Sequence, residues 1–554
     1  MAWVNIRATM AIFTLLLGGV LGGCAGGSGS NGTPATVSAP VVLLTSPADN
    51  ATGVLLTKPI AVAFSKEMKA DAFTATTFTA TSSSGTVSGA ITYANGYATL
   101  TPTTLLVPST RYTITVAGGV QASDGSVLAA PYSWSFTTGL LDPNFGNGGV
   151  VISPVSMTFE DGARAVAVQA DGKIVAVGYV DSGNGNYDFA VARYNTDGSL
   201  DTTFDGDGIA ITAISADGRD EAHAIVIQTD GQIVVAGVTS NTTTGTDFVV
   251  ARYNSSNGSL DTSFNGSGYI TTDFGFTNDE VFAVALQSTG KIVVVGQTGS
   301  LTDANFALAR YTTSGMLDAT FGVSGRQVTS FGDGFDAAYA IAIQPGDKIV
   351  VAGISDSTPG LGINNDFALA RYDANGVLDP TFDNDGKVMT AIGVADEGAF
   401  AVGIQSTGKI VAAGAVLNAA GNNDFGVVRY NVDGSLDTTF AAGGPVPGTT
   451  LTDMSGGNDV ALALMIQPDD KIMVGGAAFV TNQGNDLALA RYHADGGADM
   501  TFDADGKTVT NISAAHDTAY GLALRPASGG KVVLVGSTGT GSAADFLLVG
   551  FIAP

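Results

Sequence analysis

The chain has 554 residues, with 23 Lys+Arg against 50 Asp+Glu, a formal net charge of −27, 75 glycines and a single cysteine. A protein this acidic lacks the basic surface that binds phosphate backbones or anionic lipid, so we expect no nucleic-acid partner. Apolar residues make up 45% of the chain and charged residues only 13%. Gly, Thr, Val and Asp outnumber the strong helix formers, which favours many short strands and predicts an all-β protein.

The first 23 residues have the pattern of a secretory signal. The apolar run that follows Arg7 is too short to span a bilayer as an ordinary helix. The stretch Leu21-Gly22-Gly23 then leads into Cys24, and it resembles the bacterial lipobox. The resemblance implies that residues 1–23 are removed as a lipoprotein signal peptide and that Cys24 carries a lipid.

Residues 24–39 are predicted to be the lipid anchor and a flexible linker. Their Gly/Ser-rich composition is typical of a coil with a root-mean-square span of roughly 20 Å. Residue 25 is Ala rather than Asp, which, by the same resemblance, favours the outer membrane over retention at the inner one. We therefore expect an exported protein that is held to the membrane by its lipid, at the outer membrane or the cell surface.

Residues 40–138 alternate strand-like runs with turn clusters. The clearest runs cover residues 60–64, 97–101, 112–116 and 132–137. About seven short strands in about 100 residues predict an Ig-like β-sandwich, here without a disulfide. The order of Ser46-Pro47, Leu100-Thr101-Pro102 and the closing Trp134-Ser135-Phe136 resembles the SbsA-type bacterial Ig-like domain. That resemblance implies a spacer or adhesive module without catalytic residues, so we expect a stalk.

From residue 141 onward the chain repeats one unit with a period of about 60 residues, which indicates a propeller. A run similar to Asp-Gly-Lys-Ile-Val recurs around Lys173, Gln232, Lys291, Lys348, Lys409, Lys471 and Lys531. The first unit predicts one four-stranded blade, with strands at residues 165–169, 173–179, 189–194 and 209–212. The first of these runs alternates small side chains with Val, and small side chains fit the strand nearest the crowded central axis. With their Leu-Asp-x-x-Phe runs, the copies resemble delta-60 repeats, a family whose implied fold is a β-propeller.

The last copy stops after its third strand, and the missing piece stands at the start of the repeats. Leu141-Asp142 and Phe145 supply the absent Leu-Asp-x-x-Phe run, and residues 149–153 supply a strand. We predict that this strand completes the last blade, giving a seven-bladed β-propeller over residues 141–554 with N-terminal strand closure. Glycines recur after the third-strand turn, after the Phe run and at the end of the second strand, and we interpret them as turn positions.

An arginine ends the third strand in six copies, and an aspartate follows about eight residues later. A planar guanidinium can hold that carboxylate together with nearby carbonyls. A catalytic centre needs only one copy, so sixfold repetition indicates a structural role. The seventh copy has Gly550 at this place. The structural arginines are Arg193, Arg252, Arg310, Arg371, Arg429 and Arg491.

An acid precedes every innermost strand, and further acids precede most third strands at the same strand ends. Both sets should ring one face of the disc, either as caps of turns or as an anionic ring that draws cations to the channel mouth. The loops of this face vary most among the copies, and binding residues tend to lie on such loops. The candidate binding face is therefore marked by Asp161, Asp220, Asp279, Asp336, Glu397, Asp459 and Asp517.

Metal and catalytic motifs are sparse. Asp-rich turns on the opposite face, such as residues 205–208, partly resemble calcium loops, but the EF-hand spacing is missing. We expect ordinary β-turns there, with Ca²⁺ as the alternative and no other cofactor. The three histidines have no metal-ligand spacing, and no nucleophile elbow, phosphate loop or His-Glu-x-x-His run is present.

These observations favour a non-catalytic binding or adhesion protein with a propeller head on an Ig-like stalk. We expect a monomer whose partners are the membrane, through the lipid anchor, and a surface glycan or protein ligand. The alternative is a secreted carbohydrate-active enzyme, a lyase or hydrolase, that uses carboxylates on the variable propeller face. Propellers do host such enzymes, but fold alone does not assign a function.

Overall fold

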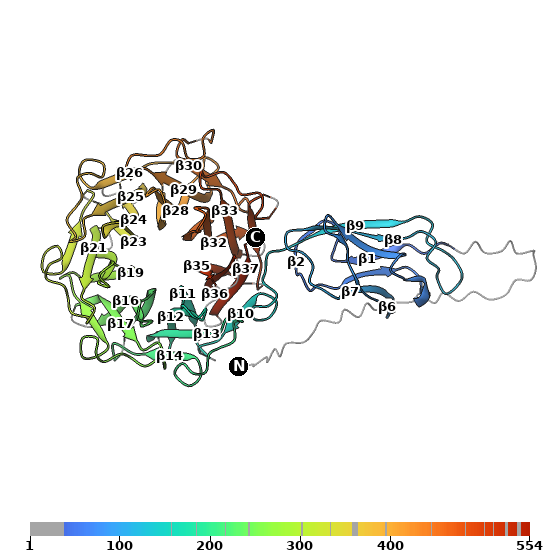
Figure 1. Cartoon of the computed structure of the whole chain (residues 1–554), viewed down its shortest axis with the longest axis horizontal. Coiled ribbons are helices and arrows are strands. Elements are labelled where there is room, and N and C mark those ends of the chain that lie inside the picture. Colours follow the sequence, from blue (N-terminus) through green and yellow to red (C-terminus); the bar gives the residue numbers. More distant parts are fainter. Residues whose placement is uncertain are drawn as a thin grey trace, which may run out of the picture.

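The computed structural model describes residues 38–553, apart from 157, 184, 217, 242–243, 301–302, 333, 357–363, 394–395, 445, 482–483, 504, 514, 527–529 and 540–543. Over this range the chain is all-β, with an Ig-like sandwich followed by a β-propeller (Figure 1). None of the helices in this range has the length and apolarity needed to cross a membrane. The signal sequence and Cys24 lie outside the described residues.

Two sheets build the Ig-like domain. One has the order β1 (Val42–Ser46), β3 (Ile60–Phe64), β7 (Tyr97–Pro102), β6 (Gly89–Ala94). The other has the order β2 (Ala51–Val54), β9 (Tyr132–Thr138), β8 (Arg111–Val116), β4 (Phe78–Ser82), β5 (Gly85–Thr86), and a short 3₁₀ helix, η1, covers Ala70–Ala72. Buried and partly buried residues alternate along β3, as expected when one face of a strand meets the core. Trp134 and Phe136 belong to that core, with exposures of 3% and 0%.

The propeller units share one strand order, which follows the chain from the innermost to the outermost strand. The first unit comprises β11 (Asp161–Val168), β12 (Ile174–Asp181), β13 (Tyr187–Tyr194) and β14 (Ile209–Thr212). The next two are β15 (Asp220–Ile227), β16 (Ile233–Asn241), β17 (Gly245–Tyr253), β18 (Tyr269–Thr272), and β19 (Asn278–Leu286), β20 (Ile292–Ser300), β21 (Asp303–Tyr311), β22 (Arg326–Thr329). One parallel pair between β17 and β19 joins them into an eight-stranded sheet.

Three further four-stranded sheets continue the ring (Figure 1). They are β23 (Asp336–Gln344), β24 (Lys348–Asp356), β25 (Asn365–Tyr372), β26 (Lys387–Thr390); β27 (Gly398–Ile404), β28 (Ile410–Leu417), β29 (Asn423–Tyr430), β30 (Thr449–Thr452); and β31 (Asp459–Ile466), β32 (Ile472–Val480), β33 (Gly484–Tyr492), β34 (Lys507–Thr510).

The last sheet combines the two ends of the repeat region. Its order is β10 (Val150–Ser153), β37 (Asp545–Ile552), β36 (Lys531–Thr538), β35 (Asp517–Arg525). β10 runs antiparallel to β37, from the pair Val150↔Val549 to the pair Ser153↔Phe546. A strand from the start of the repeats therefore occupies the outer edge of the sheet formed by the end of the chain.

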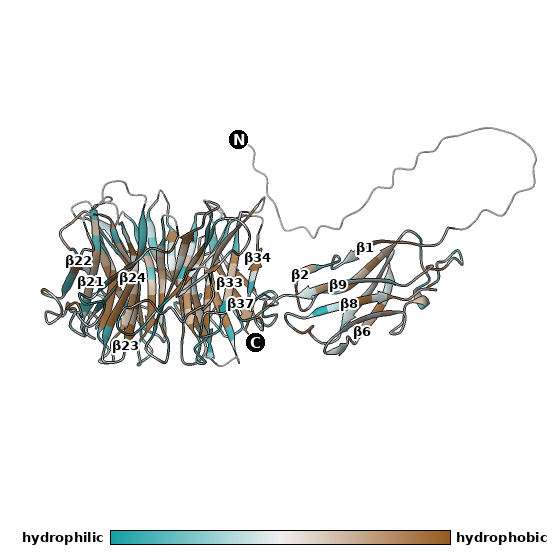
Figure 2. Ribbon diagram, turned by 90° about the horizontal axis from the view of Figure 1, so that it is seen from above, coloured by the Kyte–Doolittle hydropathy of each residue, from teal (hydrophilic) through white to brown (hydrophobic). Residues whose placement is uncertain are grey.

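The second and third strands of each unit are almost completely buried. Both of their faces pack against neighbouring sheets, so they read as continuous apolar runs rather than as alternating patterns. For example, Val175 and Val177 of β12 share a cluster with Ile233 and Val235 of β16. Figure 2 shows these strands as brown, hydrophobic ribbons standing side by side through the disc. The core is thus a series of apolar layers between adjacent units.

The Ig-like domain joins the propeller through a short connection, and it lies beside the rim in Figures 1 and 2. The Gly139 N–H donates to the Val54 carbonyl at 2.9 Å, and the Ile552 N–H donates to the Leu140 carbonyl at 2.7 Å. Leu140 is only 1% exposed. The connection is therefore bonded to both domains.

Candidate functional site

Every innermost strand carries a β-bulge at the same place. In β11 the register with β12 shifts between Ala163 and Ala165, and the corresponding shift occurs in the other six sheets. A bulged residue has no partner in the ladder, and the bulge turns its side chain in a new direction. The bulged residues are Arg164, His223, Phe282, Tyr339, Phe400, Leu462 and Tyr520.

All seven bulged side chains line one pocket of about 410 Å³, together with Arg219 and Glu221. The innermost strands surround the central hole of the ring (Figure 1), so this central pocket lies in the channel. Each bulge is three residues from the acid that marks the strand start, a distance of about 10 Å along a strand. The central pocket is therefore on the side of the variable loops, which is the candidate binding face from the sequence.

Half of the central pocket is a continuous aromatic surface. The ring of His223 stacks on Phe282, with centroids 5.6 Å apart and planes inclined by 13°. Phe282 contacts Tyr339 at 4.9 Å, and Tyr339 contacts Phe400 at 5.3 Å between ring centroids. All four side chains are partly exposed. They therefore offer an apolar floor on which a flat ligand face can pack.

The polar part of the pocket is organised by Arg219. Its Nε lies 2.7 Å from Glu221 Oε1 and its Nη1 lies 2.6 Å from Glu280 Oε1, so one guanidinium holds carboxylates from two neighbouring units. The His223 Nδ1–H donates to the Val281 carbonyl at 2.7 Å. Burial alone would raise the pKa of Glu221, but hydrogen bonds from His223 and Arg219 outweigh it and lower the pKa to about 2.

Arg164 occupies the remaining side. Its guanidinium carbon lies 4.4 Å from the centroid of the Tyr520 ring and 5.1 Å from that of Tyr179. The Tyr179 hydroxyl donates to Glu160 Oε1 at 2.7 Å. Among the described residues Arg164 forms no ion pair, in contrast to the doubly paired Arg219. The central pocket therefore combines an aromatic floor, a carboxylate bonded by Arg219, and an arginine beside two tyrosine rings.

The seven acids selected from the sequence do not line this pocket. They are at most 4% exposed, and all seven accept backbone N–H bonds from the loop that enters their strand. Asp161 Oδ2 accepts from Val155 and Ser156, both at 2.9 Å, and Asp279 Oδ2 accepts from Phe274 at 2.7 Å. The same arrangement holds at Asp220, Asp336, Glu397, Asp459 and Asp517. Burial raises the pKa of Asp161 to about 6.

The sequence predicted that the glycine at the end of each second strand is a turn residue. This prediction was wrong, because the glycine lies within the strand. Gly178 lies within β12, opposite the bulge, and a Cβ there would approach the Gly162 carbonyl oxygen to 1.9 Å. The equivalent glycines give 1.7–2.0 Å at Gly237, Gly296, Gly353, Gly414, Gly476 and Gly536. These glycines make room for the bulged backbone. They were the sequence signal for the pocket, because a residue without a side chain recurs where a strand bulges against it.

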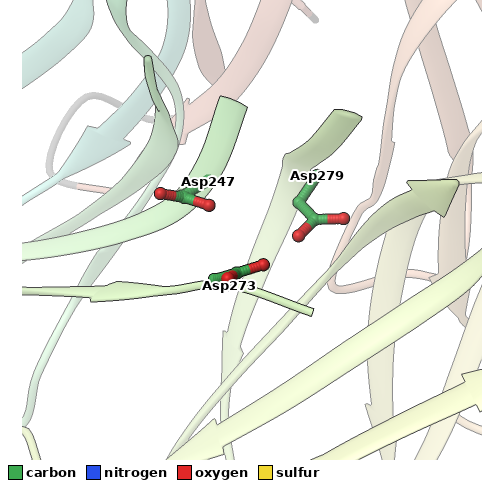
Figure 3. A group of neighbouring side chains, drawn as sticks. All are labelled: Asp247, Asp273 and Asp279. Atoms are coloured by element: carbon green, nitrogen blue, oxygen red, sulfur yellow. The ribbon is translucent and has the colours of Figure 1, made fainter. Parts of the chain in front are cut away.

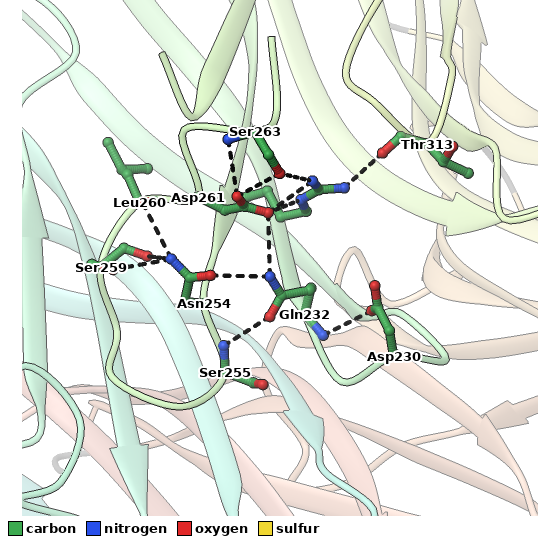
Figure 4. Close-up of polar contacts among 10 residues, drawn as sticks. Asp230, Gln232, Asn254, Ser255, Ser259, Leu260, Asp261, Ser263 and Thr313 are labelled. Atoms are coloured by element: carbon green, nitrogen blue, oxygen red, sulfur yellow. Dashed lines mark hydrogen bonds and ion pairs between the residues drawn. The ribbon is translucent and has the colours of Figure 1, made fainter. Parts of the chain in front are cut away.

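The repeated arginines lie at the other end of the third strands. Arg252 Nε is 2.7 Å from Asp261 Oδ2, its Nη1 donates to the Thr313 carbonyl of the next unit at 2.6 Å, and its guanidinium lies 4.9 Å from the Phe264 ring. Figure 4 shows the surrounding contacts, including Ser263 donating to Asp261. Equivalent Arg–Asp distances of 2.7–2.9 Å occur at Arg193, Arg310, Arg371, Arg429 and Arg491.

The seventh unit replaces this arginine with one from another strand. Arg525, at the end of β35, lies 2.9 Å from Asp142 Oδ2 and 4.8 Å from the Phe145 ring, and it donates to the Thr196 carbonyl of the first unit at 2.5 Å. A Cβ at Gly550 would lie 2.8 Å from the Phe145 ring. Sequence reasoning missed Arg525 because it compared residues at equivalent places of the repeat.

Two carboxylate triads lie near the variable loops. Asp247, Asp273 and Asp279 each place a carboxylate oxygen within 4.8 Å of the others (Figure 3), as do Asp424, Asp453 and Asp459. Burial raises the pKa of Asp279 to about 6, and the charges of Asp273 and Asp247 add to this. Bound through one oxygen each, three carboxylates supply three of the six to eight oxygens that Ca²⁺ takes.

The Asp-rich turns of the opposite face act as turn caps. In the first unit, Asp207 Oδ1 accepts the Ile209 N–H at 2.9 Å. Asp385 accepts the Lys387 N–H in the same way, also at 2.9 Å. Such Asx bonds are the ordinary chemistry of aspartate in turns.

Comparison with protein families identifies both parts of the chain. Residues 36–138 match the model of a bacterial Ig-like domain. Residues 169–204, 228–264, 287–321, 344–382, 405–440 and 467–502 match a β-propeller domain of unknown function, DUF5122. The chain therefore carries a bacterial Ig-like domain followed by a DUF5122 β-propeller. No curated protein sequence matches it.

Solved structures resemble the propeller at low sequence identity. A protein of unknown function from Dyadobacter fermentans is 11% identical, with a TM-score of 0.41 over 74% of this chain and 100% of that one. A PL25 ulvan lyase is 13% identical, with a TM-score of 0.44 over 71% and 96%. The β-propeller domain of the Trilobed protease from Pyrococcus furiosus is 12% identical, with a TM-score of 0.37 over 71% and 95%.

Proposed function

We propose that this chain is an exported, lipid-anchored protein of the outer membrane or cell surface, and that its propeller is a non-catalytic head that binds a carbohydrate chain. The observation that carries the proposal is the set of bulged side chains in the central pocket. One residue from each unit converges there, and four of them form the aromatic floor. The Ig-like domain is the stalk that carries the head.

A sugar matches the chemistry of this pocket. A pyranose ring has an apolar face of C–H groups and an edge of hydroxyl groups. The apolar face can pack on Phe282, Tyr339 and Phe400, as ligands do on aromatic pocket walls. The hydroxyls can donate to Glu221 and Glu280, because ionised carboxylates only accept hydrogen bonds.

The state of Glu221 favours binding over hydrolysis. A hydrolase that uses two carboxylates needs one of them protonated at working pH, with a raised pKa. The pKa of Glu221 is instead lowered to about 2, and Arg219 bonds both Glu221 and Glu280. This pair is therefore suited to accept hydrogen bonds from a ligand and poorly suited to protonate one.

The proposal is tested by titrating the secreted form of the protein with a panel of oligosaccharides in a calorimeter. We expect Tyr339→Ala to weaken binding of the recognised glycan about tenfold, because it removes a stacking surface. Tyr97→Ala is the matched control, since Tyr97 lies on β7 of the Ig-like domain and is 40% exposed. It should leave binding unchanged.

Two outcomes would contradict the proposal. If no glycan binds, or if Tyr339→Ala binds as tightly as the unmodified protein, the central pocket is not the carbohydrate site. Release of shorter or unsaturated products during the titration would show turnover and favour the enzyme alternative.

A further inference from the structure

Arg164 gives the central pocket a cationic side. The Tyr520 and Tyr179 rings lie 4.4 and 5.1 Å from its guanidinium carbon, and no described carboxylate forms an ion pair with it. A guanidinium has five N–H donors in its plane. Stacking on aromatic faces uses the faces of the group and leaves these in-plane donors available to a ligand.

The neighbouring arginine has the opposite arrangement. The donors of Arg219 bond Glu221 and Glu280 at 2.7 and 2.6 Å, so its charge is neutralised within the protein. In a chain with 50 acidic residues and 23 basic ones, a carboxylate partner for Arg164 would be easy to supply. An arginine that enters a ligand pocket without such a partner is suited to an anion that arrives with the ligand.

We infer that the glycan is acidic, and that Arg164 binds the carboxylate or sulfate of one sugar residue while the aromatic floor holds the ring beside it. This inference rests on the proposed function. Planar forks of N–H donors match both groups bidentately. Glu221 lies on another side of the same pocket, where it accepts hydroxyl hydrogens. The three features together position one charged sugar in one orientation.

The charge of the whole molecule restricts the kind of acidic glycan. With a net charge of −27, the protein repels a densely charged polyanion at long range. A glycan in which acidic sugars are separated by neutral ones can still place one anionic group against Arg164. Because it carries fewer charges, the acidic protein repels it less. Partly methyl-esterified polyuronates and lightly sulfated galactans are the two sources of this chemistry.

The test uses two ligand pairs that differ only in charge. Partly methyl-esterified oligogalacturonate is compared with its fully esterified form, and sulfated κ-carrageenan oligosaccharide is compared with the desulfated form. We expect the unmodified protein to prefer the charged member of one pair, which identifies the source. Arg164→Gln should weaken binding of that charged member about tenfold or more and leave the neutral member unaffected. Arg164→Lys should recover part of the loss, because a point charge remains.

Arg326→Gln is the matched control, since Arg326 lies on the outermost strand β22. Thermal melting of each variant checks that the head is folded. Equal binding of charged and neutral members by both the unmodified protein and Arg164→Gln would overturn the inference. If Tyr339→Ala still weakens binding in that case, the proposed carbohydrate function stands. If neither pair nor any glycan of the panel binds, both fail.

Discussion

At the scale of single residues, a repeated glycine and a repeated arginine define the structure of the propeller. The glycine gives space to the bulged backbone of the neighbouring strand, and the arginine bonds an aspartate and the next unit. The glycine of each second strand has no side chain because the bulged backbone of the first strand fills that space. The arginine of six third strands bonds an aspartate of its own unit, and in at least five of these units it also donates to a carbonyl of the next unit. Burial alone would raise the pKa of Asp201, but Lys173, Thr203 and Arg193 hold that pKa below its usual range.

The close contact between the bulge and the glycine opposite to it predicts that adding one methyl group at the glycine lowers the stability of the propeller. In Gly296→Ala the new Cβ would lie 1.8 Å from the Glu280 carbonyl oxygen, so the bulge that presents Phe282 must move. We expect a loss of about 1–3 kcal/mol in the stability of the head, as for other overpacked sites, measured by denaturant unfolding.

A second glycine provides the control for that substitution. Gly332 has open space where a Cβ would stand, so Gly332→Ala should leave stability nearly unchanged. Equal stability of the two variants would show that the bulge tolerates a side chain opposite to it.

At the scale of elements, the sequence predicts most strands, because turn residues bound them. The runs at residues 60–64 and 209–212 coincide with β3 and β14. The innermost strands are different: residue 165 was the predicted start, whereas β11 begins at Asp161. Asp161, Gly162 and Arg164 do not read as a strand, since Asp and Gly are depleted in strands. Only pairing with β12 reveals the bulge, so the pocket residues were not among the predicted site residues.

The closing sheet gives a prediction for Arg525. Its removal would leave Asp142, which is 0% exposed, with Lys531 as its remaining ion-pair partner in the described structure. Because Lys531 still compensates the charge of Asp142, the cost is that of a lost hydrogen bond to a charged group, about 1.5–3 kcal/mol. We expect Arg525→Met to destabilise the propeller by about that amount, as measured by calorimetric melting.

The control for Arg525→Met is Arg111→Met on the exposed end of β8, where the guanidinium bonds neutral partners. Its effect on the propeller should be negligible. A propeller transition that is the same with and without Arg525 would show that β10 and β37 hold the last sheet without this ion pair.

At the scale of the whole molecule, part of the acidic charge lies inside the protein wall. The seven acids at the strand starts are buried, and the aspartates of the Leu-Asp runs are paired with arginine and, in most units, with lysine. The formal charge therefore overstates what a ligand meets at the central pocket. Composition alone predicts no nucleic-acid partner, whereas only the arrangement of the acids shows that no described carboxylate pairs with Arg164.

The proposed anchor gives the prediction at this scale. Cys24→Ser removes the only cysteine of the chain, and with it the sulfur atom to which a lipid would be attached. We expect the protein to move from the membrane pellet to the soluble exported fraction, because lipid chains supply the affinity for the bilayer. Ser28→Ala in the same linker is the control and should stay in the pellet. Unchanged partitioning of the Cys24→Ser protein would contradict lipid anchoring.

Arg525, which bonds the last unit to the first, affects where the number of repeated units can change. At least five of the repeated arginines bond their unit to the following one, whereas the bond between the last unit and the first is made by Arg525, outside the repeated position. Duplication or loss of one internal unit would therefore keep a complete set of bonds between neighbours. The end unit, by contrast, has no substitute, so natural variation in repeat number should be confined to the middle of the chain.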